Sequence, residues 1–144
     1  MTETPQLQRK MTLLAAVLLL IGLFTGFYLA AAMTGKVPAD AKMVVAAHLN
    51  ALLGSFWMFG VAFSLPLTRY GEKGMTRLIW ATAIPNYANW AVTCVKAWWK
   101  VSGVDATGEG HNDTIFGLLT ALVVLPSLFA AGAWIYGLAG KKAS

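Results

Sequence analysis

The chain has few charged residues and only one cysteine. Of its 144 residues, 12% are Asp, Glu, Lys or Arg, whereas soluble proteins average about 25%. Such a chain cannot cover a water-facing surface with charge, which excludes an ordinary cytosolic enzyme, a disordered chain and a nucleic-acid-binding domain. A single cysteine excludes an intrachain disulfide and any cysteine-rich metal site. The length predicts one domain, residues 1–144.

Acidic residues are the scarcest charged type, and all six lie outside four long apolar runs. Each run reaches the roughly 20 residues that a membrane-spanning helix needs, and none shows the alternation of a strand. We therefore predict an all-α fold, an integral membrane four-transmembrane-helix bundle. A proton-coupled exporter requires a carboxylate inside the membrane. The four runs contain none, which argues against an exporter. The helices are expected at about 11–33, 43–67, 76–99 and 114–139.

The basic residues are distributed unevenly between the two predicted membrane sides. Four spans place both termini on one side, which then holds Arg9, Lys10, Arg69, Lys73, Arg77, Lys141 and Lys142. The other side holds Lys36, Lys42, Lys96 and Lys100. By the positive-inside rule both termini are cytoplasmic, as in a multi-pass protein of a bacterial inner membrane. The net charge of +5 then belongs to loops beside lipid headgroups and not to a nucleic-acid surface.

His48 is the only histidine in a predicted span and lies about five residues inside the second helix. One interpretation is a structural histidine that bonds to a neighbouring helix. The other is a metal or haem ligand, or a proton-transfer group. Isolated ionisable residues inside membranes are functional by default.

The third predicted helix carries polar residues along one face. Their spacings of four, three, four, three and four keep them on the same side of a helix. They form either a polar seam between helices or the wall of a substrate cavity. The residues are Thr82, Asn86, Asn89, Thr93, Lys96 and Lys100.

Depth connects this polar stripe with His48. Thr93 and His48 both lie roughly 8–9 Å below the outer boundary at 1.5 Å per residue. If the second and third helices are neighbours, His48, Asn89 and Thr93 are expected to face one outward-opening pocket. Tyr87 and Trp90 flank the stripe as packing groups or as an aromatic wall. Further expected pocket residues are Asn50, Ser55 and Asn86.

Three groups of residues resemble the small four-helix membrane isomerases, styrene oxide isomerase and hydroxylaminobenzene mutase. The first is Arg9-Lys10-Met11 followed by Gly22-Leu23-Phe24-Thr25-Gly26. The second is Ala47-His48-Leu49 with Gly54, Val61-Ala62-Phe63 and Leu65-Pro66. The third is Tyr87-Ala88-Asn89-Trp90.

The resemblance implies an isomerase that acts on a small hydrophobic aromatic substrate. His48 matches the axial ligand of a ferric haem b, which is a Lewis acid at the subunit interface of a homotrimer. Catalytic roles are implied for Asn89, Thr93 and Tyr87. Gly54 and Thr93 replace an asparagine and a tyrosine of the isomerase. The reaction is then arylhydroxylamine to aminophenol, as in the mutase, or aryl epoxide to aldehyde.

The alternative is a non-catalytic or electron-transfer haem-binding membrane protein. Electron-transfer haems usually take two side-chain ligands, and only one histidine lies in a span. A single ligand favours an open iron position for substrate.

Overall fold

The structure is a computed structural model that describes residues 3–140, and those residues contain helices but no strand. Three long helices come first: α1 (Thr4–Met33), α2 (Ala41–Ser64) and α3 (Glu72–Trp99). A short 3₁₀ turn, η1 (Leu65–Leu67), follows α2. The last rod consists of α4 (Gly110–Leu118), the π-helical segment η2 (Leu119–Val124) and α5 (Leu125–Leu138).

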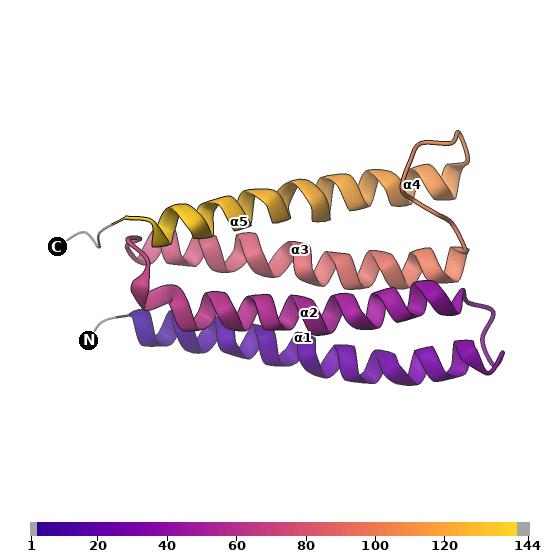
Figure 1. The fold of residues 1–144 in the computed structure, drawn as a ribbon, viewed down its shortest axis with the longest axis horizontal. Helices are drawn as coiled ribbons and strands as arrows, with labels where there is room; N and C mark the ends of the chain where they lie inside the picture. Colours follow the sequence, from indigo (N-terminus) through magenta and orange to yellow (C-terminus); the bar gives the residue numbers. More distant parts are fainter. Residues whose placement is uncertain (1–2, 141–144) are drawn as a thin grey trace.

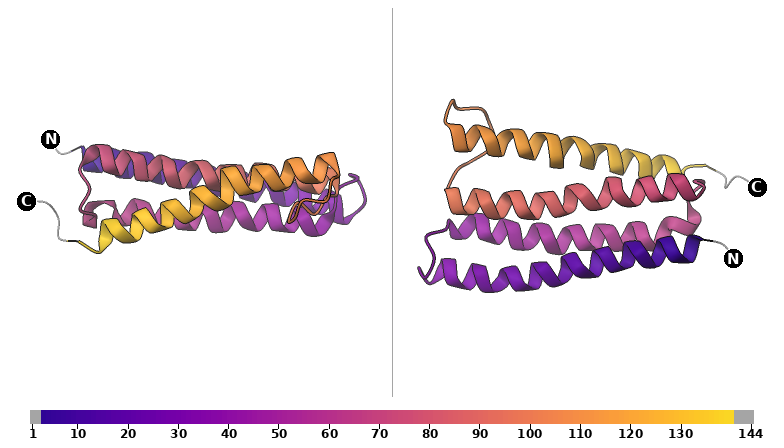
Figure 2. Two further views of the ribbon diagram at one scale, coloured as in Figure 1. Left: turned by 90° about the horizontal axis from the view of Figure 1, so that it is seen from above. Right: turned by 180° about the vertical axis from the view of Figure 1, so that it is seen from behind.

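The helices form a bundle of four antiparallel rods (Figure 1). α1 packs against α2, α2 against α3, and α3 against η2 and α5, while α1 also reaches α3. The start of α1 and the end of α5 lie at the same end of the bundle, and the three views agree on this (Figure 2). The predicted all-helical architecture is thus present in residues 3–140.

Helix ends are held by local hydrogen bonds. Asp40 caps α2, where its Oδ1 accepts from the backbone N–H of Lys42 at 2.9 Å. Glu109 caps α4 by accepting from the backbone N–H groups of Asn112 and His111. These bonds, with that of Asn112 contributing most, lower the pKa of Glu109 because they form to the ionised carboxylate.

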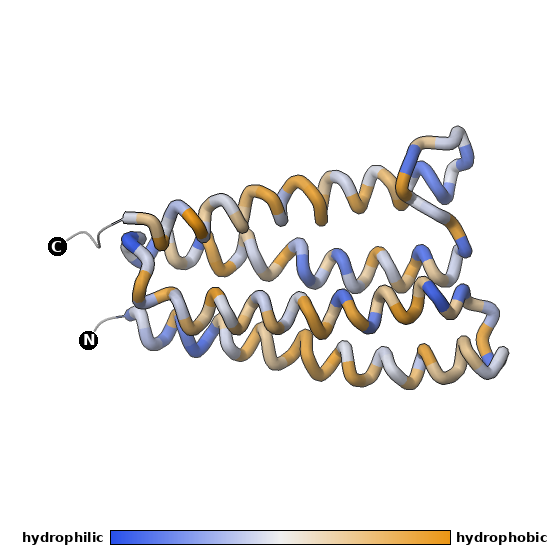
Figure 3. Tube along the Cα trace, in the orientation of Figure 1, coloured by the Kyte–Doolittle hydropathy of each residue, from blue (hydrophilic) through white to orange (hydrophobic). Residues whose placement is uncertain are grey.

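Three stretches are long and apolar enough to cross a membrane: Thr4–Met33, Ala41–Leu67 and Gly110–Leu138. Hydrophobic residues predominate along these stretches (Figure 3), and many of their large side chains are exposed, among them Phe27 at 74% and Phe129 at 70%. Exposed apolar surface on this scale marks contact with lipid or with another protein, and helices of this length and hydropathy fit a bilayer. The chain is therefore an integral membrane protein.

α3 is as long as the other rods but less apolar. Its 28 residues span about 42 Å at 1.5 Å per residue, and it runs the length of the bundle (Figure 1). It is not among the three apolar stretches, because the polar stripe and the charged residues of its ends lower its hydropathy.

The observed helix ends differ from the expected ones in several places. α1 begins at Thr4 rather than near residue 11, and α4 begins at Gly110 rather than near 114. The second helix ends in the 3₁₀ turn η1. The π-helical segment η2 was not expected. Pro126 explains it, because a proline ring collides with the carbonyl four residues earlier, here that of Leu122 inside η2.

α1 and α2 approach closely at Gly22. A Cβ atom at this position would lie 2.9 Å from Leu52 Cδ2 and 3.0 Å from Ala51 Cβ. Only glycine allows this separation, as in other small-residue contacts between membrane helices. The close approach brings the backbone of α1 against the side of α2 that carries His48.

Candidate active site

His48 lies at the contact of α2 with α1. Its Nδ1 is 2.7 Å from the carbonyl oxygen of Gly22, and the side chain is half-buried. A carbonyl can only accept, so in the neutral ring Nδ1 carries the proton and donates. Nε2 is then unprotonated and keeps its lone pair. No hydrogen bond to Nε2 occurs within residues 3–140.

This arrangement fits a histidine that ligates haem iron. Metal-binding histidines almost always donate the other ring N–H to a carbonyl or carboxylate, which fixes the tautomer and orients the ring. His48 meets that condition through Gly22. Residues 3–140 contain no group of three His, Cys, Asp or Glu side chains placed to hold a metal ion, but a haem iron needs only an axial ligand.

The polar stripe of α3 faces α2. Asn50 of α2 donates through Nδ2 to Asn89 Oδ1 at 3.1 Å and to Thr93 Oγ1 at 3.1 Å. Thr93 is 5% exposed, and Thr82 on the same stripe is fully buried and bonds to the carbonyl of Leu78. The structure therefore brings together three of the predicted site residues: Asn50, Asn89 and Thr93.

A polar hollow opens beside this cluster between α2, α3 and α5. Its volume is about 200 Å³, and an engineered cavity of about 150 Å³ holds benzene. A single aromatic ring therefore fits. Among the residues that the structure describes, no ionisable side chain lines it. The lining residues are Asn50, Leu53, Gly54, Trp57, Asn86, Asn89 and Ser127.

Asn86 enters the hollow because residue 54 has no side chain. A Cβ at Gly54 would lie 2.6 Å from Asn86 Oδ1 and 3.2 Å from its Cγ. The amide nitrogen of Asn86 donates to the carbonyl of Thr82 at 2.8 Å, so its orientation is held from α3. Gly54 and Asn86 together thus place a carboxamide against the backbone of α2.

Replacing Gly54 with alanine is expected to displace Asn86 and to destabilise the bundle. Overpacking a tight contact typically costs about 1–3 kcal/mol. The matched control is Gly117→Ala, because a Cβ there meets nothing within 4 Å. Thermal unfolding in detergent measures the difference. Equal midpoints for the two variants would contradict the tight contact.

Of His48, Asn89 and Thr93, only Asn89 lines the hollow, which corrects the expectation of one pocket. Thr93 is joined to it through Asn50, and His48 is not. His48 and Asn50 are two residues apart, so they point about 200° apart around the helix. His48 bonds to α1, whereas Asn50 bonds to α3. Ser55 also differs from expectation: it is fully buried, donates to the carbonyl of Leu52 at 2.6 Å and does not line the hollow.

Tyr87 and Trp90 face α1 and form no wall of the polar hollow. The Tyr87 hydroxyl donates to the carbonyl of Leu14 at 2.8 Å. Trp90 Nε1 donates to Thr25 Oγ1 at 2.9 Å. Each lines a separate, mainly apolar hollow between α1 and α3.

The aromatic residue in the polar hollow is Trp57, which the sequence pattern did not single out. It lies seven residues after Asn50 and therefore on the same side of α2. That spacing could have identified it. Ser127 of α5 also lines the hollow, and no sequence signal connects it with the distant α2 and α3 residues.

A profile of the styrene oxide isomerase family matches residues 7–139, nearly the whole chain. The chain belongs to the styrene oxide isomerase family. It is also 25% identical over 115 residues to hydroxylaminobenzene mutase HabB of Ectopseudomonas oleovorans. That alignment covers 78% of this chain and 66% of the relative, so the chain spans slightly less than two thirds of the mutase. No solved structure matches the chain significantly.

Membership of the styrene oxide isomerase family confirms the resemblance that the three sequence segments predicted. The family and the mutase relative both point to an isomerase. Every residue of the candidate site, from His48 to Ser127, lies inside the matched range. The polar hollow therefore lies within the part of the chain that matches the family.

Proposed function

We propose that the chain is a membrane-embedded mutase that converts a small arylhydroxylamine into an aminophenol. The observation that carries this proposal is the uncharged, amide-lined hollow between α2, α3 and α5 in a member of the styrene oxide isomerase family. The relative HabB is named a hydroxylaminobenzene mutase. The second candidate reaction converts an aryl epoxide to an aldehyde. Its substrate matches the hydrogen-bonding groups of the hollow less well.

The carboxamides of the hollow offer both donors and acceptors to a ligand. Within residues 3–140, Asn89 Nδ2 and Asn50 Oδ1 have no protein partner, and none of these atoms is a buried orphan. An arylhydroxylamine has N–H and O–H donors for the amide oxygens and an oxygen that accepts from Asn89. An epoxide only accepts, so it would leave amide oxygens unpaired, which costs affinity.

The chain's own residues hold the substrate while the N–O bond breaks and a ring C–O bond forms. The C–H bond at that ring carbon also breaks, and an N–H bond forms, so that one proton moves from carbon to nitrogen overall. The reaction is an isomerisation, so no atom is gained or lost overall. Neutral amides suit a neutral –NHOH group, and Trp57 packs beside the ring. Lipid and the apolar side chains of the hollow, Leu53 and Trp57, exclude water. Water would otherwise compete as a nucleophile for the electron-poor ring. A ferric haem b would supply a Lewis acid that weakens the bond to oxygen.

We propose that His48 holds this haem and that the protein is a homotrimer. The Nδ1 bond to Gly22 supports the ligand role. Within one chain, His48 and the polar hollow lie on opposite sides of α2. A group bound by His48 therefore reaches a polar hollow most directly when that hollow belongs to a neighbouring copy of the chain.

We propose further that α3 is a fourth membrane crossing and that both termini are cytoplasmic in a bacterial inner membrane. The basic residues Arg9, Lys10, Arg69, Lys73 and Arg77 support this side, whereas Lys141 and Lys142 lie outside the described residues. A reporter that is active only in the cytoplasm should work when fused to the C-terminus and fail when inserted near residue 106. The reverse pattern would contradict the orientation.

Membranes that contain the chain are expected to convert phenylhydroxylamine to aminophenol, and styrene oxide more slowly or not at all. Chromatography of both incubations measures the products, and membranes without the chain are the control. A rearranged aldehyde without aminophenol would favour epoxide isomerisation. No product from either compound, with haem bound, would favour a non-catalytic or electron-transfer haem protein.

A further inference from the structure

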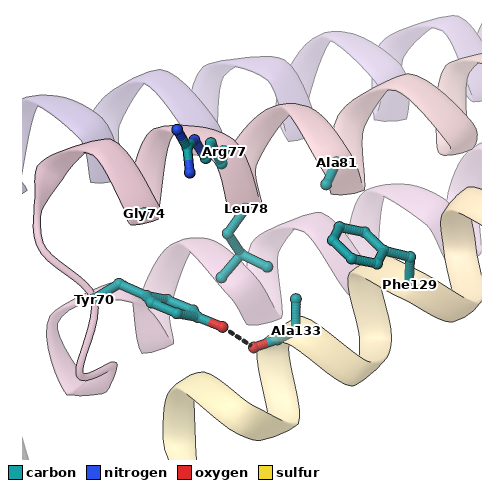
Figure 4. A pocket seen from close by; sticks show the side chains of 7 residues that line it. All are labelled: Tyr70, Gly74, Arg77, Leu78, Ala81, Phe129 and Ala133. Carbon is teal, nitrogen blue, oxygen red and sulfur yellow. Dashed lines mark hydrogen bonds between the residues drawn. The ribbon is translucent and has the colours of Figure 1, made fainter.

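A second hollow lies at the end of the bundle where α1 begins and α5 ends (Figure 1), between the start of α3 and α5 (Figure 4). Its volume is about 270 Å³. It is lined by Tyr70, Gly74, Arg77, Leu78, Ala81, Phe129 and Ala133. An adjoining groove along α5 shares Tyr70, Phe129 and Ala133 with it. We call the two together the α3–α5 groove. This groove shares no residue with the polar hollow.

The groove is a built feature of the fold. Tyr70 reaches across to α5, where its hydroxyl donates to the carbonyl of Ala133 at 2.6 Å (Figure 4). Its ring lies between two glycines: a Cβ at Gly137 would come within 2.6 Å of the ring, and one at Gly74 within 2.9 Å of Tyr70 Cβ. Two residues without side chains thus allow Tyr70 to close one end of the groove.

The groove combines apolar walls with cations that lack a counter-charge. Arg77 lines it. The Cζ atom of Arg69 lies 3.4 Å from the ring centroid of Tyr136, and Tyr136 lines the adjoining part of the groove. Among residues 3–140 neither arginine has a carboxylate within 4.0 Å, since the one ion pair there, His111 with Glu109, is at the start of α4. The groove therefore presents positive charge beside otherwise apolar walls.

We propose that the α3–α5 groove binds one anionic phospholipid. The phosphate lies at Arg77, and an acyl chain follows Leu78, Ala81 and Phe129 along α5. Anionic headgroups are attracted to basic clusters that flank membrane helices. A helix from a second copy is a poorer occupant, because it would bury the two arginines without a partner, which is costly.

The test measures which lipid the purified full-length chain retains. After exchange into a neutral detergent, equal amounts of phosphatidylglycerol and phosphatidylcholine are added, and native mass spectrometry counts bound lipid. Wild type should retain phosphatidylglycerol several-fold more, and Arg77→Gln should lose that preference. The matched control, Arg9→Gln, removes an exposed cation of α1 outside the groove and should keep it. Ala81→Phe fills the groove and should lower retention without changing charge.

Four outcomes would overturn the proposal. Equal retention of the two lipids would remove the anionic selectivity, and equal losses in Arg77→Gln and Arg9→Gln would indicate general charge attraction. If inorganic phosphate raised the thermal midpoint of the chain as much as phosphatidylglycerol does, the groove would bind a free anion and not a lipid. If Ala81→Phe changed the mass of the oligomer but not lipid retention, the groove would be occupied by a second copy of the chain. The test needs no turnover, so its failure is distinct from failure of the mutase assay.

Discussion

His48→Ala is expected to abolish haem binding and mutase activity, with turnover reduced by more than 100-fold. Loss of a partner that only orients a ligand already costs about 10–100-fold, and this change removes the proposed ligand atom Nε2 itself. The carbonyl of Gly22 stays in place but has no ring to orient. The absorption spectrum of the detergent-purified chain measures bound haem, and aminophenol formation measures turnover.

The matched control is His111→Ala. His111 is the other histidine of the chain; its side chain is 64% exposed and stacks on Trp99 with ring centroids 4.4 Å apart. This variant should retain the haem spectrum and the turnover of the unmodified chain. The ligand assignment is wrong if His48→Ala keeps both, or if His111→Ala loses the spectrum instead.

Asn89→Leu is expected to lower kcat/KM for the arylhydroxylamine by about 100–1000-fold, the usual effect of removing one preorganised donor from an active site. Asn89 contributes its Nδ2 to the hollow, and its Oδ1 accepts from Asn50 and Thr93. Leucine has a similar volume but offers no hydrogen bond. Initial rates in membranes measure the effect, and the thermal midpoint of the purified variant reports whether folding is also altered.

Thr82→Val is the matched control for the polar stripe. Thr82 is fully buried on the same face of α3, but its hydroxyl bonds to the carbonyl of Leu78 in its own helix and it does not line the hollow. Its kcat/KM should stay within a few-fold of the unmodified chain. A similar loss in both variants would mean that the stripe only joins helices, and a fully active Asn89→Leu variant would exclude the hollow as the substrate site.

The polar stripe shows how far sequence periodicity reaches. Spacings of three and four residues place Thr82, Asn86, Asn89 and Thr93 on one face. In the structure Thr82, Asn86 and Thr93 are buried, and Asn89 is half-buried. Periodicity does not tell which neighbour the face meets. Asn50 supplies that information, because its amide bonds to both Asn89 and Thr93.

The expected single pocket was wrong for a geometric reason. Similar depth in the membrane is a statement about position along an axis, whereas a shared pocket also requires a shared direction around each helix. His48 and Asn50 are close along α2 but point to different neighbours. In the same way, Tyr87 and Trp90 are near Asn89 in sequence but turn toward α1.

The sequence by itself determined that this is a helical membrane protein, because long apolar runs without acids can be buried only in lipid. It also determined which chemistry is present: one histidine in a span, several amides and no intramembrane carboxylate. Only the tertiary structure decided how these groups combine. The rotation of each helix depends on close contacts such as Gly22 with Leu52 and Gly54 with Asn86. These contacts join residues far apart in the chain, so no local pattern encodes them.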